Sequence, residues 1–177
     1  MTLIIQDDTG TVENANSLVT GAYYVSYMAE RGVTIAYTTT EEIAQVDADL
    51  IQANSYMETL NKYCGTKVDG RDQTTQFPRL ELYDCEGYLV EGIPREMQHA
   101  QCEYANIHRE NGTLQPNEST GGGIKREKKK VDVLEKEVEY FSEGQSGAVI
   151  AYPVADNKIP KSFICKSCTS NEDLTNY

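Results

Sequence analysis

The chain has 177 residues, a formal net charge of −12 at pH 7 and 39% hydrophobic residues. This length fits one ordinary domain with its own core and excludes two large domains. The acidic charge disfavours unspecific binding to nucleic acid phosphates, which requires clustered Lys and Arg. The hydrophobic fraction is low for a compact globule, so we expect only part of the chain to pack tightly by itself.

The N-terminal stretch is expected to be an arm followed by a first helix. Residues 2–5 are apolar enough for a short edge strand or for an arm laid on a neighbouring molecule. Asn16 or Ser17 then provides a cap for a helical pattern that ends at Arg31-Gly32. The apolar residues of this pattern lie on one side of the helix: Leu18, Ala22, Val25, Met28 and Ala29.

The strongest signal is a long amphipathic helix between residues 40 and 64, with Thr40 as its N-cap and Gly65 as its stop. Acidic residues are expected on the wet face, among them Asp47, Asp49 and Glu58. We expect this helix to pack antiparallel to the first one. Its apolar residues recur at steps of three and four and form one stripe: Ile43, Val46, Leu50, Ala53, Met57 and Leu60.

A long loop and a third helix complete the predicted core. Residues 65–92 contain many Gly, Asp and Pro residues, which predicts an ordered loop or one with a small hairpin. Phe77-Pro78-Arg79 is its expected anchor. Ile93-Pro94 opens the third helix, in which Pro occupies the first turn, and Asn111-Gly112 ends it.

The composition changes after residue 113. Residues 115–123 are rich in Gly and polar residues, and the β-branched, alternating stretch that follows predicts a projecting β-hairpin with a basic run at 125–130. The chain is therefore expected to be mainly α, with a small core of three to four helices, a hairpin and extended N- and C-terminal arms. The predicted division is an arm (1–15), a core (16–113), a joint with hairpin (114–142) and a C-terminal docking segment with tail (143–177).

Motifs for catalysis or cofactor binding are missing from the sequence. It contains no GxxxxGK[ST], GxGxxG, HExxH or GxSxG pattern. His99 and His108 are nine residues apart, which is unsuitable for a shared metal, and the many acidic residues do not converge on one place. No run approaches the roughly twenty apolar residues of a membrane span. We therefore expect neither an enzyme nor a cofactor nor a membrane partner.

The five cysteines are expected to be reduced thiols, because their number is odd, their spacing has no disulfide framework and no secretory signal precedes them. Cys165 and Cys168 form a CxxC pair, which is able to ligate zinc or to undergo redox cycling. Zinc requires two further ligands, so the pair is a weak metal candidate.

The order of motifs resembles a family of tailed-phage head–tail connector or adaptor proteins, whose members often carry a DnaT-like single-stranded-DNA-binding label. The resemblance covers residues 3 to 160. The chain departs from it in having no Trp, in a longer and more basic hairpin, and in the cysteine-bearing tail after Phe163. The motifs that carry it include Ala15-Asn16-Ser17, Arg31-Gly32, Leu50-Ile51-Gln52-Ala53, Gly65-Thr66-Lys67, Gln76-Phe77-Pro78-Arg79, Tyr83-Asp84-Cys85-Glu86-Gly87, Ile93-Pro94, Ile124-Lys125-Arg126-Glu127, Val138-Glu139-Tyr140 and Tyr152-Pro153.

The resemblance implies a structural virion protein without catalysis. Such a protein forms a ring, expected to be a dodecamer, in the neck between the portal and the tail or nozzle protein, after assembly in the host cytoplasm. Genomic DNA then passes through the lumen without specific binding.

On this reading the loop and the hairpin contact a neighbouring subunit or the tail, and the C-terminal segment docks on the portal. One alternative is a single-stranded-DNA-binding accessory protein, in which the basic run and the tyrosines would form the binding groove. The other is a CxxC-dependent metal or redox protein. The interface residues are Phe77, Pro78, Arg79, Tyr83, Lys125, Arg126, Lys128, Val138 and Tyr140, and the portal-docking residues are Tyr152, Pro153, Ile159, Phe163 and Ile164.

Overall fold

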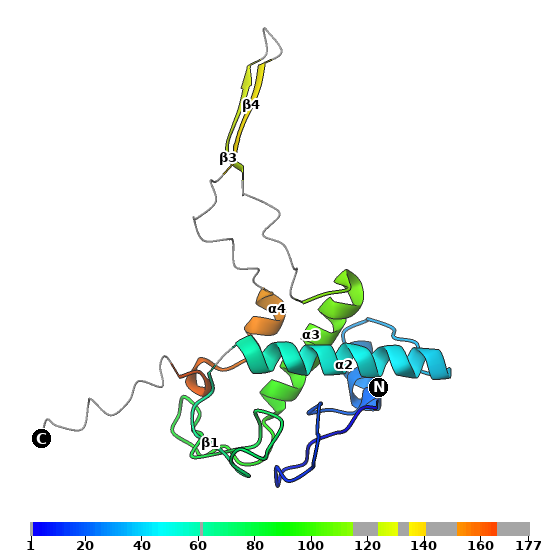
Figure 1. Cartoon of the computed structure of the whole chain (residues 1–177), viewed down its shortest axis with the longest axis vertical. Helices are drawn as coiled ribbons and strands as arrows, with labels where there is room; N and C mark the ends of the chain where they lie inside the picture. Colours follow the sequence, from blue (N-terminus) through cyan, green and yellow to red (C-terminus); the bar gives the residue numbers. More distant parts are fainter. Residues whose placement is uncertain (1, 61, 115–123, 131–134, 141–151, 166–177) are drawn as a thin grey trace, which may run out of the picture. The chain divides into compact units, whose positions relative to one another are not determined.

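A computed structural model describes residues 2–60, 62–114, 124–130, 135–140 and 152–165 (Figure 1). The chain forms two compact units, Met1–Leu114 with Tyr152–Tyr177 and Gln115–Ala151. The first unit contains the helices and a small sheet, and the second contains a β-hairpin. The elements of the first unit are α1 (Gly21–Ala29), α2 (Thr40–Leu60), β1 (Thr66–Lys67), β2 (Arg79–Leu80), α3 (Arg95–Asn111), α4 (Pro153–Asp156) and the 3-10 turn η1 (Lys161–Phe163).

The prediction of a mainly α fold with a small helical core and a hairpin is confirmed. The hairpin pairs β3 (Ile124–Lys130) with β4 (Glu135–Tyr140) in antiparallel register. Among the described residues no helix is long and apolar enough to cross a membrane.

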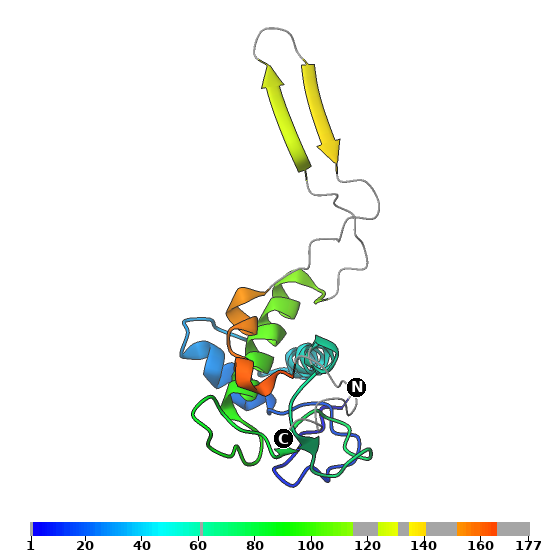
Figure 2. The same ribbon diagram turned by 90° about the vertical axis from the view of Figure 1, so that its left-hand side faces the viewer.

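The core forms mainly where α2 crosses α3, which is visible in the two perpendicular views of Figures 1 and 2. The predicted antiparallel pairing of α2 with α1 is therefore wrong as the main contact. The stripe of α2 is buried at Val46, Leu50, Ala53 and Met57, whereas Ile43 and Leu60 at its two ends remain partly exposed. The side chains that α3 buries are Met97, Ala100, Gln101, Cys102, Glu103, Tyr104 and Ala105.

Helix α2 begins with a capping box one residue earlier than predicted. Thr39, not Thr40, is the capping residue, because its Oγ1 accepts a hydrogen bond from Glu42 N at 3.2 Å. The Glu42 carboxylate accepts in return from Thr39 N at 3.0 Å and from the backbone and hydroxyl of Thr38. This reciprocal pattern satisfies N–H groups that the first turn leaves without helical partners.

The capping box at Glu42 predicts that the stability of the fold depends on pH. The Thr39 and Thr38 N–H groups lower the pKa of Glu42 from 4.5 to about 2. A carboxyl with a lowered folded-state pKa stabilises the fold above its unfolded pKa, and this contribution is lost as the pH falls through about 2. We expect Glu42→Gln to be less stable than wild type at pH 6, with the difference shrinking below pH 4.5. Urea unfolding of both proteins from pH 6 to pH 2.5 measures this, and a gap independent of pH would contradict it.

Helix α1 begins later than predicted. Thr20, rather than Asn16 or Ser17, is its N-cap, and its side chain accepts from Tyr23 N. Residues 17–19 form a buried turn because Gln101 of α3 supplies partners to its backbone and to Ser17: Oε1 accepts from Leu18 N at 2.9 Å, and Nε2 donates to Ser17 Oγ at 2.9 Å. The contact with a distant helix therefore decides where α1 starts.

The N-terminal residues pack against other residues of the same chain. Ile5 forms a bridge with Ser17, and Gln6 N donates to Ser17 O at 2.8 Å. The buried Gln6 side chain also donates to Thr75 Oγ1 at 3.2 Å. The arm of residues 2–6 therefore helps to hold the long loop that follows α2.

Candidate functional site

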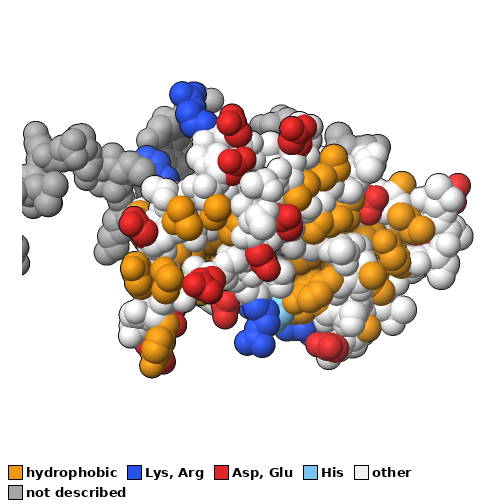
Figure 3. Space-filling model, turned by 90° about the horizontal axis from the view of Figure 1, so that it is seen from below, with side chains coloured by type: hydrophobic (Ala, Val, Ile, Leu, Met, Phe, Trp, Pro, Cys, Tyr) orange, Lys and Arg blue, Asp and Glu red, His pale blue; other side chains and the backbone are white. Residues whose placement is uncertain are grey.

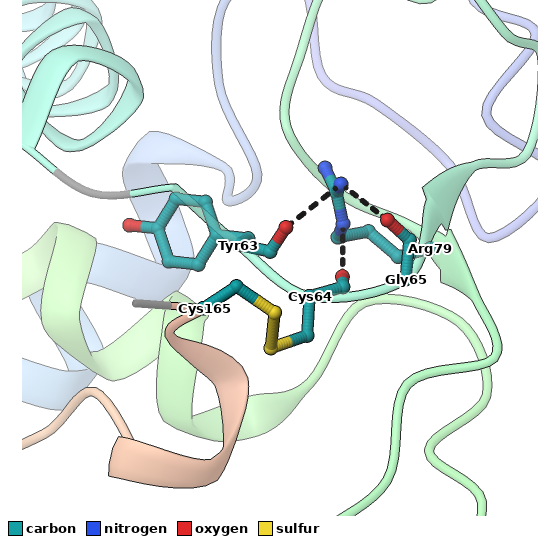
Figure 4. Close-up of a disulfide and its surroundings, with 5 residues drawn as sticks. All are labelled: Tyr63, Cys64, Gly65, Arg79 and Cys165. Atoms are coloured by element: carbon teal, nitrogen blue, oxygen red, sulfur yellow. Dashed lines mark hydrogen bonds between the residues drawn. A yellow bond between two sulfur atoms is a disulfide. The ribbon is translucent and has the colours of Figure 1, made fainter. Parts of the chain in front are cut away.

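The long loop of residues 65–92 is held at its base by Arg79 (Figure 4). Its guanidinium donates to the backbone oxygens of Cys64 at 2.6 Å, Gly65 at 2.8 Å and Tyr63 at 3.1 Å. The same group donates to the backbone and side-chain oxygens of Gln76, both at 3.1 Å. Arg79 thus bonds both ends of the loop base, and its described contacts are within the chain.

Phe77 and Pro78 belong to the core of the first unit. Phe77 is 1% exposed and packs edge-on against Tyr63, with ring centroids 4.9 Å apart, and against Phe163 at 6.4 Å. Pro78 is buried beside it and follows a cis peptide bond. The anchoring role predicted for Phe77-Pro78-Arg79 is confirmed. In this fold Phe77 and Pro78 offer little surface to a partner.

The distal part of the loop, residues 80–91, forms an ordered projection that we call the tongue. Leu82 is buried, and its carbonyl accepts from Val90 N at 2.8 Å. Tyr83 and Leu89 form an antiparallel bridge above it. At the tip, Asp84 Oδ1 accepts from the backbone N–H of Glu86 and of Tyr88, each at 2.9 Å. These bonds fix the tip without help from a partner.

The tongue exposes large apolar side chains between carboxylates. Its acidic residues are Glu81, Asp84, Glu86 and Glu91, and residues 80–91 contain no Lys or Arg. One face of the first unit accordingly shows hydrophobic side chains in several patches among Asp and Glu (Figure 3). The exposed apolar side chains of the tongue are Leu80 at 50%, Tyr83 at 51%, Tyr88 at 67% and Leu89 at 51%.

The described part of the C-terminal segment, residues 152–165, packs on the helical core of the same chain. Ile159 and Phe163 are buried in the core, and Tyr152 and Ile164 are half-buried. Tyr104 donates to the Asp156 carboxylate, and Tyr152 Oη donates to Leu114 O at 3.1 Å. Of the predicted portal-docking residues, only Pro153 is exposed. Other exposed residues of this segment are Val154, Asn157 and Lys161.

The prediction of reduced thiols is wrong for two cysteines. Cys64 and Cys165 form a disulfide, which joins the residue before Gly65 to the C-terminal segment (Figure 4). Two backbone bonds flank it, from Cys64 N to Phe163 O and from Cys165 N to Lys62 O, both at 2.8 Å. Cys102 is a buried free thiol, and burial raises its pKa.

The Cys165–Cys168 pair, predicted as a weak zinc candidate, loses one of its two ligands, because the Cys165 sulfur is bonded to the Cys64 sulfur. Cys168 lies outside the described residues. Within the described ranges, no cluster of His, Cys, Asp or Glu is arranged to hold a metal ion.

The two histidines serve internal contacts. His108 Nδ1 lies 2.8 Å from Asp49 Oδ1, and Arg109 Nη1 lies 3.2 Å from Asp49 Oδ2. Asp49 is fully buried, so its predicted place on the wet face of α2 is wrong. His99 packs against the Tyr27 ring at 4.6 Å, and burial, with nearby Arg31, lowers its pKa. The contacts of Asp49 with His108 and Arg109 thus link α2 to α3, which sequence periodicity alone does not reveal.

The register of the hairpin sets three of its six basic strand residues opposite acidic ones, and Lys129 opposite Lys136. Arg126 pairs with Glu139, Lys128 with Glu137 and Lys130 with Glu135. Val138 stands opposite Glu127, Tyr140 opposite Ile124, and the register shifts between Ile124 and Arg126, where Lys125 lies. Three of the five basic residues of β3 therefore stand opposite carboxylate residues of their own hairpin, and the predicted role of the run as an interface remains a prediction.

Comparisons with known proteins give one family. A family model described as "Putative DnaT-like ssDNA binding protein" matches residues 1–172. No curated protein and no solved structure shows significant similarity. Because the match spans nearly the whole chain, the protein belongs to this DnaT-like family.

Proposed function

We propose that the protein is a structural, protein-binding subunit that acts as a head-to-tail connector in a tailed phage. The observation that carries this proposal is the tongue, which is ordered by its own hydrogen bonds and exposes Leu80, Tyr83, Tyr88 and Leu89. Large apolar side chains held on a rigid loop are typical of protein-docking sites. The resemblance of the motif order to connector proteins supplies the more specific role.

In this proposal the protein works without catalysis and without a cofactor. It forms a ring, a dodecamer by the resemblance, in the neck of the virion, with the portal on one side and the tail or nozzle protein on the other. The chain assembles in the host cytoplasm before it is incorporated.

The charge of the first unit supports passage of DNA rather than its capture. Residues 1–114 and 152–165 contain 19 Asp and Glu against nine Lys and Arg. A ring of such subunits repels phosphates at the distances where salt does not screen the charges. Duplex DNA is therefore expected to move through the lumen without adhering to it.

The test is a sedimentation experiment at low salt. The purified chain is mixed with the portal ring of the same phage and with a labelled single-stranded oligonucleotide. The connector proposal predicts that the chain sediments with the portal ring while the oligonucleotide stays free. Sedimentation with the oligonucleotide, lost as salt is raised, would overturn the proposal.

Single-stranded-DNA binding is the second candidate, and the description of the family favours it directly. Exposed Tyr83 and Tyr88 have the ring faces on which bases stack, and β3 carries the basic run. Against it stand the carboxylates that surround both tyrosines and the acidic partners of β3. The mixture described above separates the two candidates in one measurement.

Replacement of both tongue tyrosines by serine is expected to weaken binding to the partner protein by roughly tenfold or more, because exposed aromatic residues at the centre of an interface contribute disproportionately. Thermal unfolding should change little, since Tyr83 and Tyr88 are exposed. Ile43→Ser is the control, at an apolar residue of α2 that is 36% exposed and lies outside both the tongue and the predicted portal-docking segment. Titration of the tail or nozzle protein, and separately of the portal ring, with each variant measures the effect. Equal affinities for wild type and the double variant would exclude the tongue as the docking site.

A further inference from the structure

The β3–β4 hairpin cannot bury an apolar face of its own. Its thirteen strand residues include only three apolar ones, Ile124, Val138 and Tyr140. A two-stranded hairpin is at best marginally stable in water and leaves one backbone edge open on each strand. The described strands pair only with each other. Such a hairpin becomes more stable when further strands form hydrogen bonds with its two open edges.

The two edges have opposite charge. β3, with the sequence IKREKKK, has five cations and one carboxylate. β4, with the sequence EKEVEY, has three carboxylates and one cation. Lys and Arg on an exposed strand usually prevent edge-to-edge association. Here they prevent only the pairing of β3 with another β3, because the opposite edge of the same hairpin is acidic.

We propose that hairpins of neighbouring copies pair edge to edge, with β4 of one copy against β3 of the next. Antiparallel pairing in this order repeats the charge complementarity that already exists inside each hairpin, where Lys128 stands opposite Glu137 and Lys130 opposite Glu135. Pairing of two β3 edges or of two β4 edges sets like charges opposite each other, which is destabilising. The occupant of each edge is therefore a second copy of this chain.

This pairing is head-to-tail, and a head-to-tail contact produces a closed ring when the rotation between copies closes. The inference thus rests on the ring in the proposed function, and it names the hairpin edges as the surface through which neighbouring copies of the ring contact each other. It adds that the basic strand recognises the acidic strand of a neighbour rather than a nucleic acid. Salt is expected to weaken the association, because the proposed contacts are between opposite charges that mobile ions screen.

The test uses three charge variants of the full-length chain. The first reverses β3 (Arg126→Glu, Lys128→Glu and Lys130→Glu), the second reverses β4 (Glu135→Lys, Glu137→Lys and Glu139→Lys), and the third combines both sets. Sedimentation velocity should show self-association of the wild type and of the combined variant. Each single-strand variant should associate roughly tenfold more weakly or worse, because opposite charges become like charges.

The decisive comparison is a mixture of the wild type with the combined variant, each with its own fluorescent label. The combined variant keeps every charge pair inside its hairpin, so a folding defect does not explain its behaviour. We expect each protein to assemble with itself and to exclude the other, because both mixed edges bring like charges together. Free mixing of the two labels, or a wild-type chain that stays monomeric, would overturn the inference.

Portal binding measured on the same proteins keeps the two proposals separate. If the labels segregate but neither protein binds the portal ring, the hairpin pairing holds and the connector role fails. If both bind the portal while the labels mix freely, the connector role holds and the hairpin pairing fails. Binding of labelled single-stranded DNA that only the β3 reversal abolishes would also overturn the inference, because it gives the basic strand a different partner.

Discussion

Reduction of the Cys64–Cys165 disulfide is expected to lower the free energy of unfolding by about 4 kcal/mol. The bond joins residues 101 positions apart, so it removes many conformations from the unfolded chain. The native contacts nearby, including buried Phe163, remain after reduction. The effect should therefore appear in stability more than in structure. Urea unfolding followed by circular dichroism, with and without a dithiol, measures it.

Two variants provide the controls for this measurement. The double variant Cys64→Ala/Cys165→Ala should have the stability of the reduced protein and should not respond to the dithiol. Cys85→Ser, at an exposed free cysteine, should behave like the wild type under both conditions. An unchanged unfolding midpoint on reduction would show that the bond does not stabilise the fold.

Replacement of Arg79 by methionine should lower the free energy of unfolding by about 3 kcal/mol. The change removes the donors for the carbonyl oxygens of Tyr63, Cys64 and Gly65 and for Gln76, all close to the core. Methionine fills similar space, so lost hydrogen bonds rather than a cavity explain the effect. Urea unfolding measures it.

Arg79→Lys tests whether geometry or charge matters. Lysine keeps the positive charge but lacks the planar fork that bonds several carbonyls at once, so it should restore only a minor part of the loss. Arg71→Met, at an exposed position of the same loop, is the matched control and should leave stability unchanged. Full rescue by lysine would argue that Arg79 acts as a charge alone.

Local patterns predicted the helices well. The periodic stripe of Val46, Leu50, Ala53 and Met57 identified α2 because burial on one face repeats with the helical period. The end of α3 was equally clear, since Gly112 adopts the left-handed conformation that ends helices, with φ of 74°. The hairpin followed from alternation of apolar residues, and residues 131–134 between its strands lie outside the described residues.

Contacts between distant residues escaped prediction. Asp49 looks like a surface residue in its helical pattern, and only the approach of His108 and Arg109 from α3 makes its burial possible. The internal partners of Arg79 were not predicted, because an isolated sequence does not show that Tyr63, Cys64 and Gly65 will present their carbonyls to it. The tongue was predicted as a functional loop, and the exposure of Tyr88 and Leu89 became evident only from its turn.

The hairpin unit is an insertion between two parts of the first unit, which contribute Leu114 and Tyr152 at its ends. The hydrogen bond from Tyr152 Oη to Leu114 O holds these two ends together at 3.1 Å. Because Leu114 and Tyr152 lie side by side, the inserted residues 115–151 are free to change in length or charge while the helical core keeps its sequence. On the proposed edge-to-edge pairing, such changes would alter how copies recognise each other without altering how each one folds.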